Sequence, residues 1–265
     1  MSVLQILGLA IVQGLTEFLP VSSSGHLILF SRMAHLQDQG IGIDIALHLG
    51  SLLAVAFYFK DTIFAMLREL FQTNFAPDFK RTHNRLAYLL VAASIPALIV
   101  GFYLRNIGLD ALRDPQIIGF NILSYGVLLY LADRFSAKTR TTANITIKDA
   151  ILIGLAQCFA LIPGTSRSGI TVTMARLLKI NRVDAAKFSM LLSMPVIAAA
   201  GCLEVYRMLS IGDFAQIMLC FEALIYSFIA SYVVIFLMMK WLKHYTYLPF
   251  ALYRVILGLM LLCWL

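Results

Sequence analysis

Long apolar segments follow one another along almost the whole chain, and they constrain its fold more than any other feature. Several reach roughly 17–25 residues, the length at which an α-helix crosses the hydrocarbon core of a bilayer. Of the 265 residues, 60% are hydrophobic and 13% are charged. Because irregular backbone and open sheet edges cannot face lipid, the sequence predicts an all-α polytopic membrane protein. We find no linker, so residues 1–265 are expected to form a single integral membrane domain.

Two polar stretches interrupt the apolar sequence. The first is Gln13–His26, read as QGLTEFLPVSSSGH, and the second is Pro163–Gly169, read as PGTSRSG. Polar groups at membrane depth are costly, so these stretches are candidates for function. Short apolar segments flank each one, and we therefore predict two re-entrant helical hairpins that meet near the membrane midplane. The flanking segments are expected at residues 3–19 and 24–36, and at residues 147–162 and 169–180.

The rest of the apolar sequence predicts membrane-spanning helices and an internal repeat. Pro20 precedes Pro163 by 143 residues, and Ile45–Ala56 precedes Phe188–Ala199 by the same offset. Interrupted segments in corresponding places indicate two inverted repeats, here residues 1–132 and 133–265. One span is expected at residues 45–59 and continues into an amphipathic stretch that ends at Phe71. The other spans are expected at residues 86–104, 116–132, 187–208, 215–239 and 248–264.

The basic residues indicate the orientation in the membrane. The loops 60–85, 134–148, 176–187 and 240–243 hold 15 of the 21 lysines and arginines. Cytoplasmic loops carry such an excess, so we expect these four loops in the cytoplasm and both termini outside. The opposite side would hold only Arg32, Arg105, Arg113 and Arg207. The same rule accounts for the net charge of +7, and no nucleic acid partner is expected.

Gln13 and Glu17 in the first polar stretch are spaced i, i+4 and share one face of a helix. A carboxylate at membrane depth suits general acid–base catalysis or the binding of a divalent metal ion. The structural alternative is that N–H groups at a helix start, or Arg167, simply satisfy Glu17. The neighbouring polar residues favour the functional interpretation.

Ser22, Ser23 and Ser24 precede a helix, and Gly25 and His26 follow them. Serine before a helix is an ordinary N-cap, which would explain one or two of the three. Free N–H groups at a helix start also bind anions such as phosphate. A serine there could donate hydrogen bonds, or act as the nucleophile if His26 or Glu17 took its proton.

The second polar stretch adds a positive charge to hydroxyl groups on Thr165, Ser166 and Ser168. The planar guanidinium of Arg167 can bind phosphate oxygens in pairs. Arg167 could instead pair only with Glu17, and the two uses are compatible.

Two further polar residues lie in apolar segments. His48 either faces the same cavity as the polar stretches or is structural. Arg254 is expected near the cytoplasmic end of the last helix, where its long side chain would reach the interface. The sequence contains no P-loop, H-E-x-x-H, G-x-S-x-G or dinucleotide-binding motif.

The motifs GLTEFLPVSSSGH (Gly14–His26) and PGTSRSG resemble the two signatures of the bacterial undecaprenyl-diphosphate phosphatases of the bacitracin-resistance type. LHLGSLLAV (Leu47–Val55) and LPFALYR (Leu248–Arg254) are similar to further segments of that family. The resemblance implies a multi-pass enzyme of the bacterial inner membrane with inverted repeats and two re-entrant hairpins, and we expect its site to open to the periplasm. It implies hydrolysis of the lipid diphosphate to the monophosphate, which recycles the cell-wall lipid carrier. It also implies a divalent cation, Mg²⁺ or Ca²⁺.

The resemblance assigns roles to individual residues. Glu17 matches a catalytic, metal-associated glutamate, Ser23 a nucleophile or phosphate ligand, and His26 a catalytic histidine. Arg167 matches a diphosphate-binding arginine. Gln13 stands where many family members carry a second glutamate, which puts a mechanism with two carboxylates in doubt. The expected substrate-binding residues are Gln13, Ser22, Ser24, Gly25, Thr165, Ser166 and Ser168.

Two alternative functions share features with this sequence. Inverted repeats and broken helices are also typical of transporters. The first alternative function is therefore a transporter or flippase of a polyprenyl phosphate lipid. A lipid phosphatase of the acid-phosphatase type needs a histidine several residues after the arginine. The next histidine after Arg167 is His244, and this type is rejected. The sequence leaves open whether the protein forms a homodimer.

Overall fold

A computed structural model describes residues 3–33, 40–107, 114–137, 139–211 and 214–264. Within these residues all regular elements are helices, and one isolated bridge joins Arg140 to Ile180. Four of the described helices are long and apolar enough to cross a membrane, and one bent helix pair would make a fifth span. The prediction of an all-α polytopic membrane protein is confirmed at this level.

The helices begin and end close to where the sequence places them, and α5, α6, α9 and α10 are longer than expected. Their bounds are α1 (Val3–Thr16), α2 (Ser23–Met33), α3 (Ile41–Tyr58), α4 (Lys60–Gln72), α5 (Thr82–Ile107), α6 (Pro115–Phe135), α7 (Ile147–Cys158), α8 (Arg167–Leu177), α9 (Arg182–Ile211), α10 (Phe214–Leu242) and α11 (Leu248–Trp264). Two 3₁₀ turns, η2 (Thr142–Asn144) and η3 (Phe159–Leu161), flank α7.

Side-chain caps explain several of the helix starts. The Asp114 carboxylate accepts a hydrogen bond from Gln116 N ahead of α6, whose first residue is a proline. Thr146 and Asp149 form a reciprocal capping box at the start of α7. Asn181 Oδ1 accepts from Asp184 N at 3.0 Å. Such caps satisfy backbone N–H groups that lack a partner within the helix.

The helices pack closely through small residues. α10 lies along α1 and α3, α6 along α11, and α7 along α5. A Cβ on Gly50 of α3 would come within 2.3 Å of the Leu224 carbonyl oxygen on α10. A Cβ on Gly14 of α1 would come within 2.4 Å of Ala230 Cβ. Small residues let helix backbones approach in this way in membranes.

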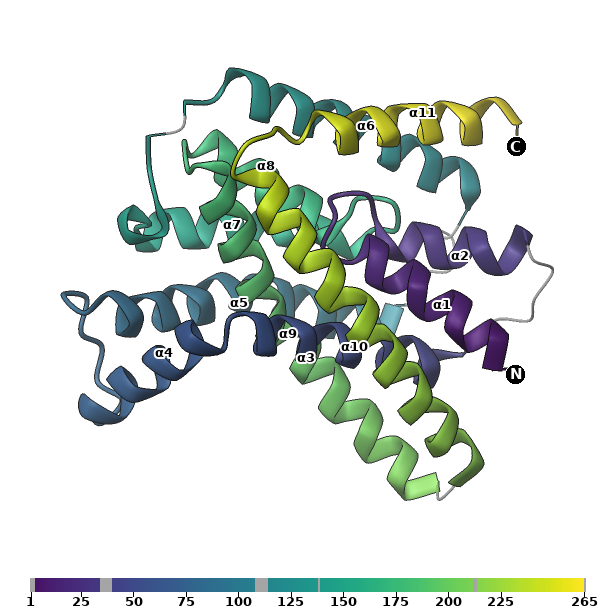
Figure 1. Ribbon diagram of the computed structural model, residues 1–265, viewed down its shortest axis with the longest axis horizontal. Coiled ribbons are helices and arrows are strands. Elements are labelled where there is room, and N and C mark those ends of the chain that lie inside the picture. Colours follow the sequence, from purple (N-terminus) through teal and green to yellow (C-terminus); the bar gives the residue numbers. More distant parts are fainter. Residues whose placement is uncertain (1–2, 34–39, 108–113, 138, 212–213, 265) are drawn as a thin grey trace.

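The arrangement of the chain ends and loops is visible in Figure 1. The first turn of α1 and the last turn of α11 lie at the same end of the molecule. Segments 73–81 and 139–146, from two of the basic loops, lie at the opposite end. Of the basic residues expected on the other side, Arg113 is outside the described residues, as are the side chains of Arg32, Arg105 and Arg207.

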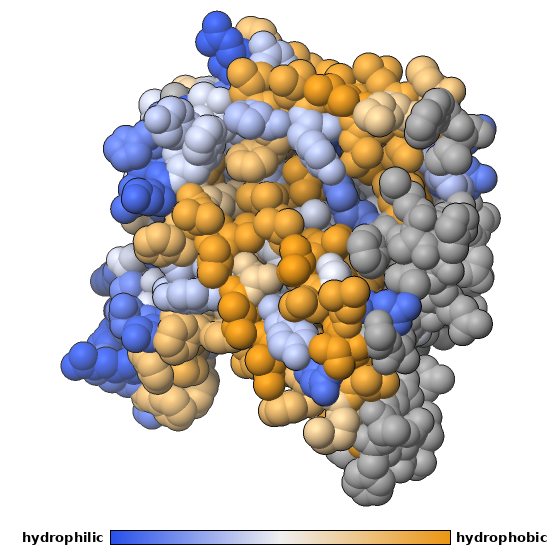
Figure 2. Space-filling view, turned by 45° about the vertical axis from the view of Figure 1, so that its right-hand side comes forward, coloured by the Kyte–Doolittle hydropathy of each residue, from blue (hydrophilic) through white to orange (hydrophobic). Residues whose placement is uncertain are grey.

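The surface between the two ends is strongly apolar. Figure 2 shows a broad hydrophobic area on the face that it presents, with hydrophilic residues gathered toward one edge. Phe102 of α5, Phe120 of α6 and Phe221 of α10 are each more than half exposed. Soluble proteins rarely leave so large a patch uncovered, so this surface fits contact with lipid.

The two polar stretches form breaks of similar construction. α1 and α7 start at residues 3 and 147, and α2 and α8 start at residues 23 and 167, an offset of 144 in both cases. This is one residue more than the offset read from the two prolines. Ser22 therefore corresponds to Ser166, and Ser23 to Arg167. The inverted relation of the two halves stays a prediction.

Candidate active site

Each break ends in a serine with left-handed backbone geometry. Ser22, directly before α2, has a φ of 81°, and Ser166, directly before α8, has a φ of 72°. For a residue other than glycine this conformation costs roughly 1–2 kcal/mol, so local contacts must offset it. Ser166 Oγ accepts from Gly169 N at 3.0 Å, and the Ser22 carbonyl accepts from His26 N at 3.2 Å. The two turns thus set where α2 and α8 begin.

The two breaks lie against each other, although they are far apart in sequence. Ser168 Oγ donates to the Leu19 carbonyl at 3.0 Å, and Ser166 Oγ is 3.2 Å from Ser168 Oγ. Asn121 of α6 donates to the Pro163 carbonyl at 2.9 Å. The bond from Ser168 to Leu19 thus joins the second break to the first, and Asn121 holds the second break against α6.

Glu17 is the centre of the site. Its side chain is 5% exposed and accepts from Arg167 Nη2 on Oε1 at 2.7 Å. On Oε2 it accepts from Ser23 Oγ at 2.7 Å and from Gln13 Nε2 at 3.0 Å. His48 Nε2 lies 3.5 Å from the same oxygen and would form an ion pair when protonated. The carboxylate therefore links α1, α2, α3 and α8.

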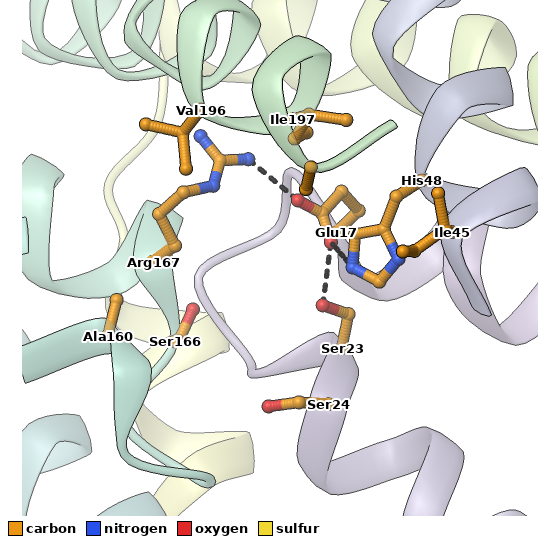
Figure 3. Close-up of a pocket in the computed structure, with 11 residues that line it drawn as sticks. Glu17, Ser23, Ser24, Ile45, His48, Ala160, Ser166, Arg167, Val196 and Ile197 are labelled. Atoms are coloured by element: carbon orange, nitrogen blue, oxygen red, sulfur yellow. Dashed lines mark hydrogen bonds and ion pairs between the residues drawn. The ribbon is translucent and has the colours of Figure 1, made fainter. Parts of the chain in front are cut away.

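Arg167 faces Glu17 across the site from the first turn of α8 (Figure 3). Its Nη2 bonds Glu17, and its Nη1 donates to the Ser189 carbonyl of α9 at 3.2 Å. Ser189 Oγ is in turn 2.6 Å from Thr171 Oγ1. A guanidinium has five N–H donors, so further N–H groups remain for a ligand.

These residues line a pocket of about 230 Å³. Its polar side is formed by Glu17, Ser23, Ser24, His48, Ser166 and Arg167, and its apolar side by Ile45, Ala160, Val196, Ile197 and Ala200. Figure 3 shows side chains from both breaks turned toward this space. A polar end that carries one cation, beside an apolar wall, fits an anionic group attached to a hydrocarbon.

The other predicted binding residues surround the pocket without lining it. Ser22 and Thr165 are buried, and their hydroxyl oxygens have no hydrogen-bond partner among the described residues. Gly25 is buried, and a Cβ there would lie 3.3 Å from Ser22 Oγ. Ser168 bonds backbone, as described above, and Gln13 reaches the site only through Glu17.

His26 bonds groups other than Glu17. Its Nδ1 lies 2.7 Å from the Ser22 carbonyl, and its Nε2 lies 2.6 Å from Tyr253 Oη of α11. Because a carbonyl oxygen only accepts, Nδ1 carries the proton. The ring also stacks on Tyr253, with centroids 5.6 Å apart. The structure does not bring His26 into the pocket, and its predicted catalytic role stays a prediction.

Sequence reasoning left the role of one supporting residue, His48, open and missed another, Ser51. His48, left open from the sequence, lines the pocket, with its Nδ1 held 2.7 Å from the Asp44 carbonyl. Ser51 of α3 lies 3.5 Å from Gln13 Nε2 and accepts from Ser231 of α10 at 2.9 Å. Serines within membrane spans are common and gave no specific signal. Only His48 stood out, as an ionisable residue in an apolar segment.

Arg254 does not extend to the interface, and that expectation was wrong. Its side chain is fully buried and bonds the backbone of both breaks. The carbonyl acceptors are Pro20 at 3.2 Å, Gly164 and Thr165 at 3.0 Å, Ile122 at 3.0 Å and Asn121 at 3.3 Å. A guanidinium can satisfy several carbonyls at once because its donors are fixed in a plane. Arg254 therefore joins the two breaks to α6.

Replacing Arg254 with methionine should destabilise the protein strongly. Five backbone carbonyls would lose a donor, and each buried acceptor left unsatisfied costs about 1–3 kcal/mol. We expect thermal unfolding in detergent to shift down by several degrees, whereas the same change at the exposed Arg134 should leave it nearly unchanged. An unaltered unfolding temperature for Arg254→Met would mean that these carbonyls do not depend on Arg254.

Several oxygen atoms around Glu17 are candidate ligands for Mg²⁺ or Ca²⁺. Both ions prefer oxygen ligands, and Mg²⁺ is often held by one or two carboxylates together with substrate phosphates. Glu17 and Ser23 offer such oxygens, and Gln13 Oε1 is buried without a partner among the described residues. The part of the chain that the structure describes contains no group of three or more His, Cys, Asp or Glu side chains able to hold a metal. The site fits a divalent ion only if the substrate supplies further oxygen ligands.

Comparisons with known proteins identify the family. The family described as "Bacitracin resistance protein BacA" matches residues 6–260. A protein of Hahella chejuensis named undecaprenyl-diphosphatase is 43% identical over 265 residues, covering 100% of this chain and 99% of its own length. A protein of that name from Roseobacter denitrificans is 44% identical over 264 residues, covering 99% and 98%. The chain described here therefore belongs to the bacitracin resistance protein BacA family.

Proposed function

We infer that this protein hydrolyses undecaprenyl diphosphate to undecaprenyl phosphate and inorganic phosphate. The observation that carries the inference is the pocket in which Glu17, Ser23 and Arg167 converge from two breaks in membrane helices. Its relatives bear the name of this activity. The reaction returns the lipid carrier to peptidoglycan synthesis and removes the diphosphate form, in keeping with the family's link to bacitracin resistance.

The pocket provides what phosphoryl transfer mainly requires, positioning and neutralisation of charge. Arg167 supplies a fixed positive charge, and its remaining N–H groups can donate hydrogen bonds to phosphate oxygens. The starts of α2 and α8 add free backbone N–H groups that favour an anion. Ile45, Val196 and Ile197 form an apolar wall beside them, next to which the first part of the lipid chain would lie.

Two routes for the nucleophile fit the geometry. Ser23 Oγ donates to Glu17 at 2.7 Å, so Glu17 is placed to take its proton. Ser23 would bond the terminal phosphorus as the bond to the bridging oxygen breaks, with the electron pair leaving on undecaprenyl phosphate. Water would then release phosphate from the serine. In the second route a water deprotonated by Glu17 attacks directly, and the products are the same.

A divalent ion would be held by Glu17, Ser23 and the diphosphate itself. Its contribution would be neutralisation of charge on the phosphate oxygens. The chain's own residues would still orient the substrate, accept the proton and separate the reacting phosphate from bulk water.

Phosphate release from undecaprenyl diphosphate by the purified protein in detergent tests the function. We expect phosphate release without any bilayer. A chelator should abolish this release, and excess Mg²⁺ or Ca²⁺ should restore it. Transport needs a bilayer, so absence of release in detergent by folded protein would favour the transporter alternative. Release that a chelator does not affect would instead remove the metal from the proposal.

We also propose that each break belongs to a re-entrant hairpin, within inverted repeats in the bacterial inner membrane. The segments flanking the breaks are short, with 14 residues in α1 and 12 in α7. The distribution of basic residues and the common end reached by α1 and α11 support a periplasmic location for both termini (Figure 1). The pocket would then open toward the periplasm.

A reporter fused after Leu265 checks this topology. A fluorescent protein that matures only in the cytoplasm should stay dark, whereas a periplasmic alkaline phosphatase fused at the same site should be active. The reverse pair of signals would place the C-terminus in the cytoplasm and overturn the proposed orientation.

A further inference from the structure

The helix α4 carries a pattern that the catalytic site does not explain. It follows α3 after one intervening residue, and the two helices are bent by 78°. α3 has 18 apolar-rich residues, which at 1.5 Å per residue span about 27 Å, close to the hydrocarbon thickness of a bilayer. The chain therefore turns sharply at about the point where α3 reaches the membrane surface.

Three stripes run along α4. Met66 is buried, and Ile63 packs against the core. Phe64, Leu67 and Phe71, spaced i, i+3 and i+7, share a second stripe, and they are 67%, 43% and 64% exposed. A third stripe, also exposed, holds Asp61, Arg68 and Gln72. One side thus faces the protein, one is apolar and uncovered, and one is polar.

α4 is held firmly in this position. Glu69 Oε2 accepts from His83 N at 3.0 Å and from Asn84 N at 2.7 Å at the start of α5. Phe71 packs edge-on against Phe75 with ring centroids 5.1 Å apart. The apolar stripe is consequently a fixed feature of the surface.

The charges nearby indicate what covers the stripe. Lys60 lies over the Phe57 ring at 5.3 Å from its centroid, at the bend. Arg68 and Lys80 are exposed, and no ion pair joins either to another described residue. Aromatic residues beside basic ones are typical of helices that lie in the headgroup layer of anionic membranes.

We propose that α4 lies along the membrane surface, with Phe64, Leu67 and Phe71 among the upper acyl chains and Arg68 and Lys80 at anionic lipid headgroups. The occupant of this surface is the bilayer itself, on the side of the basic loops. This goes beyond the proposed hydrolysis and does not depend on it.

Tryptophan fluorescence in lipid vesicles tests the proposal on the full-length chain. Both native tryptophans would first be replaced, as Trp241→Phe and Trp264→Phe. Phe71→Trp and the adjacent Gln72→Trp then form a matched pair on the apolar and polar stripes. We expect phosphatidylcholine brominated at acyl positions 6 and 7 to quench Phe71→Trp more than lipid brominated at positions 11 and 12. Gln72→Trp should be quenched instead by aqueous acrylamide.

Other results would overturn the proposal. Stronger quenching of Phe71→Trp by the deeper bromines would place α4 inside the bilayer, and quenching by acrylamide alone would place it in water. If the tryptophan of Phe71→Trp were protected from both quenchers only until the protein was diluted in lipid, this result would show that a second copy of the chain covers this face. Brominated phosphatidylglycerol should quench Phe71→Trp severalfold better than the phosphatidylcholine, and Arg68→Gln with Lys80→Gln should remove that preference. If the preference survived both changes, these two side chains would not bind the headgroups.

Discussion

Glu17→Gln should lower the rate of phosphate release by about 10²–10⁴, the usual effect of removing an acid–base group. Glutamine keeps the size of the side chain but cannot take a proton from Ser23 or from water. It also offers Arg167 a weaker acceptor in place of the carboxylate oxygen now 2.7 Å away. The loss should appear in kcat measured on purified protein in detergent.

The stability of the variant must be measured in the same preparation. Removing one partner of a buried ion pair can cost about 3–5 kcal/mol, so unfolding could imitate loss of catalysis. Glu222→Gln is the matched control, because it neutralises a carboxylate of α10 that does not line the pocket. Near-normal turnover by Glu17→Gln would make Glu17 structural and remove it as the base.

Gln13→Glu is a useful contrast on the same helix face. Gln13 Nε2 now donates to Glu17 Oε2 at 3.0 Å, and a second carboxylate would repel Glu17 there. The family resemblance described above implies that glutamate is accepted at this position. We expect activity to be kept, with a stronger dependence on the divalent ion that would screen the two charges. A variant that loses activity at every ion concentration would contradict this.

Arg167→Ala should abolish nearly all phosphate release, and Arg167→Lys should lose most of it. Arg167 bonds Glu17 through one Nη and the Ser189 carbonyl through the other, a geometry that the single ammonium of lysine cannot reproduce. Because lysine keeps the charge, the KM for the diphosphate should rise less in Arg167→Lys than in Arg167→Ala. The kcat should fall in both variants.

The thermal unfolding temperatures of the Arg167 variants show whether activity is lost because a substrate contact is missing or because the protein no longer folds. Arg134→Ala serves as the control, since Arg134 is exposed at the end of α6. A double variant with Glu17→Gln should recover part of the stability lost in Arg167→Ala, because the buried carboxylate is then no longer left alone. Normal hydrolysis by a folded Arg167→Ala protein would exclude the second break from the active site.

Much of the fold follows from local features of the sequence. The apolar runs locate the helices because a helix is the way a single segment can satisfy its backbone in lipid. The polar breaks were evident because polar residues are rare at that depth, and both occur where the sequence placed them. Glu17, Ser23 and Arg167 were singled out by residue type and motif; they line one pocket, and their catalytic roles stay predictions.

Other features depend on contacts between distant segments, which no local pattern reveals. Arg254 looked like an interfacial arginine until its bonds to Pro20, Gly164 and Thr165 were seen. His26 and His48 looked alike as ionisable residues, yet packing turns His26 toward Tyr253 and His48 toward Glu17. The sequence by itself determined that the chain forms membrane helices with two polar breaks, because burial costs depend on residue type. Tertiary structure alone decided which polar side chains face each other, because that depends on how helices far apart in the chain pack.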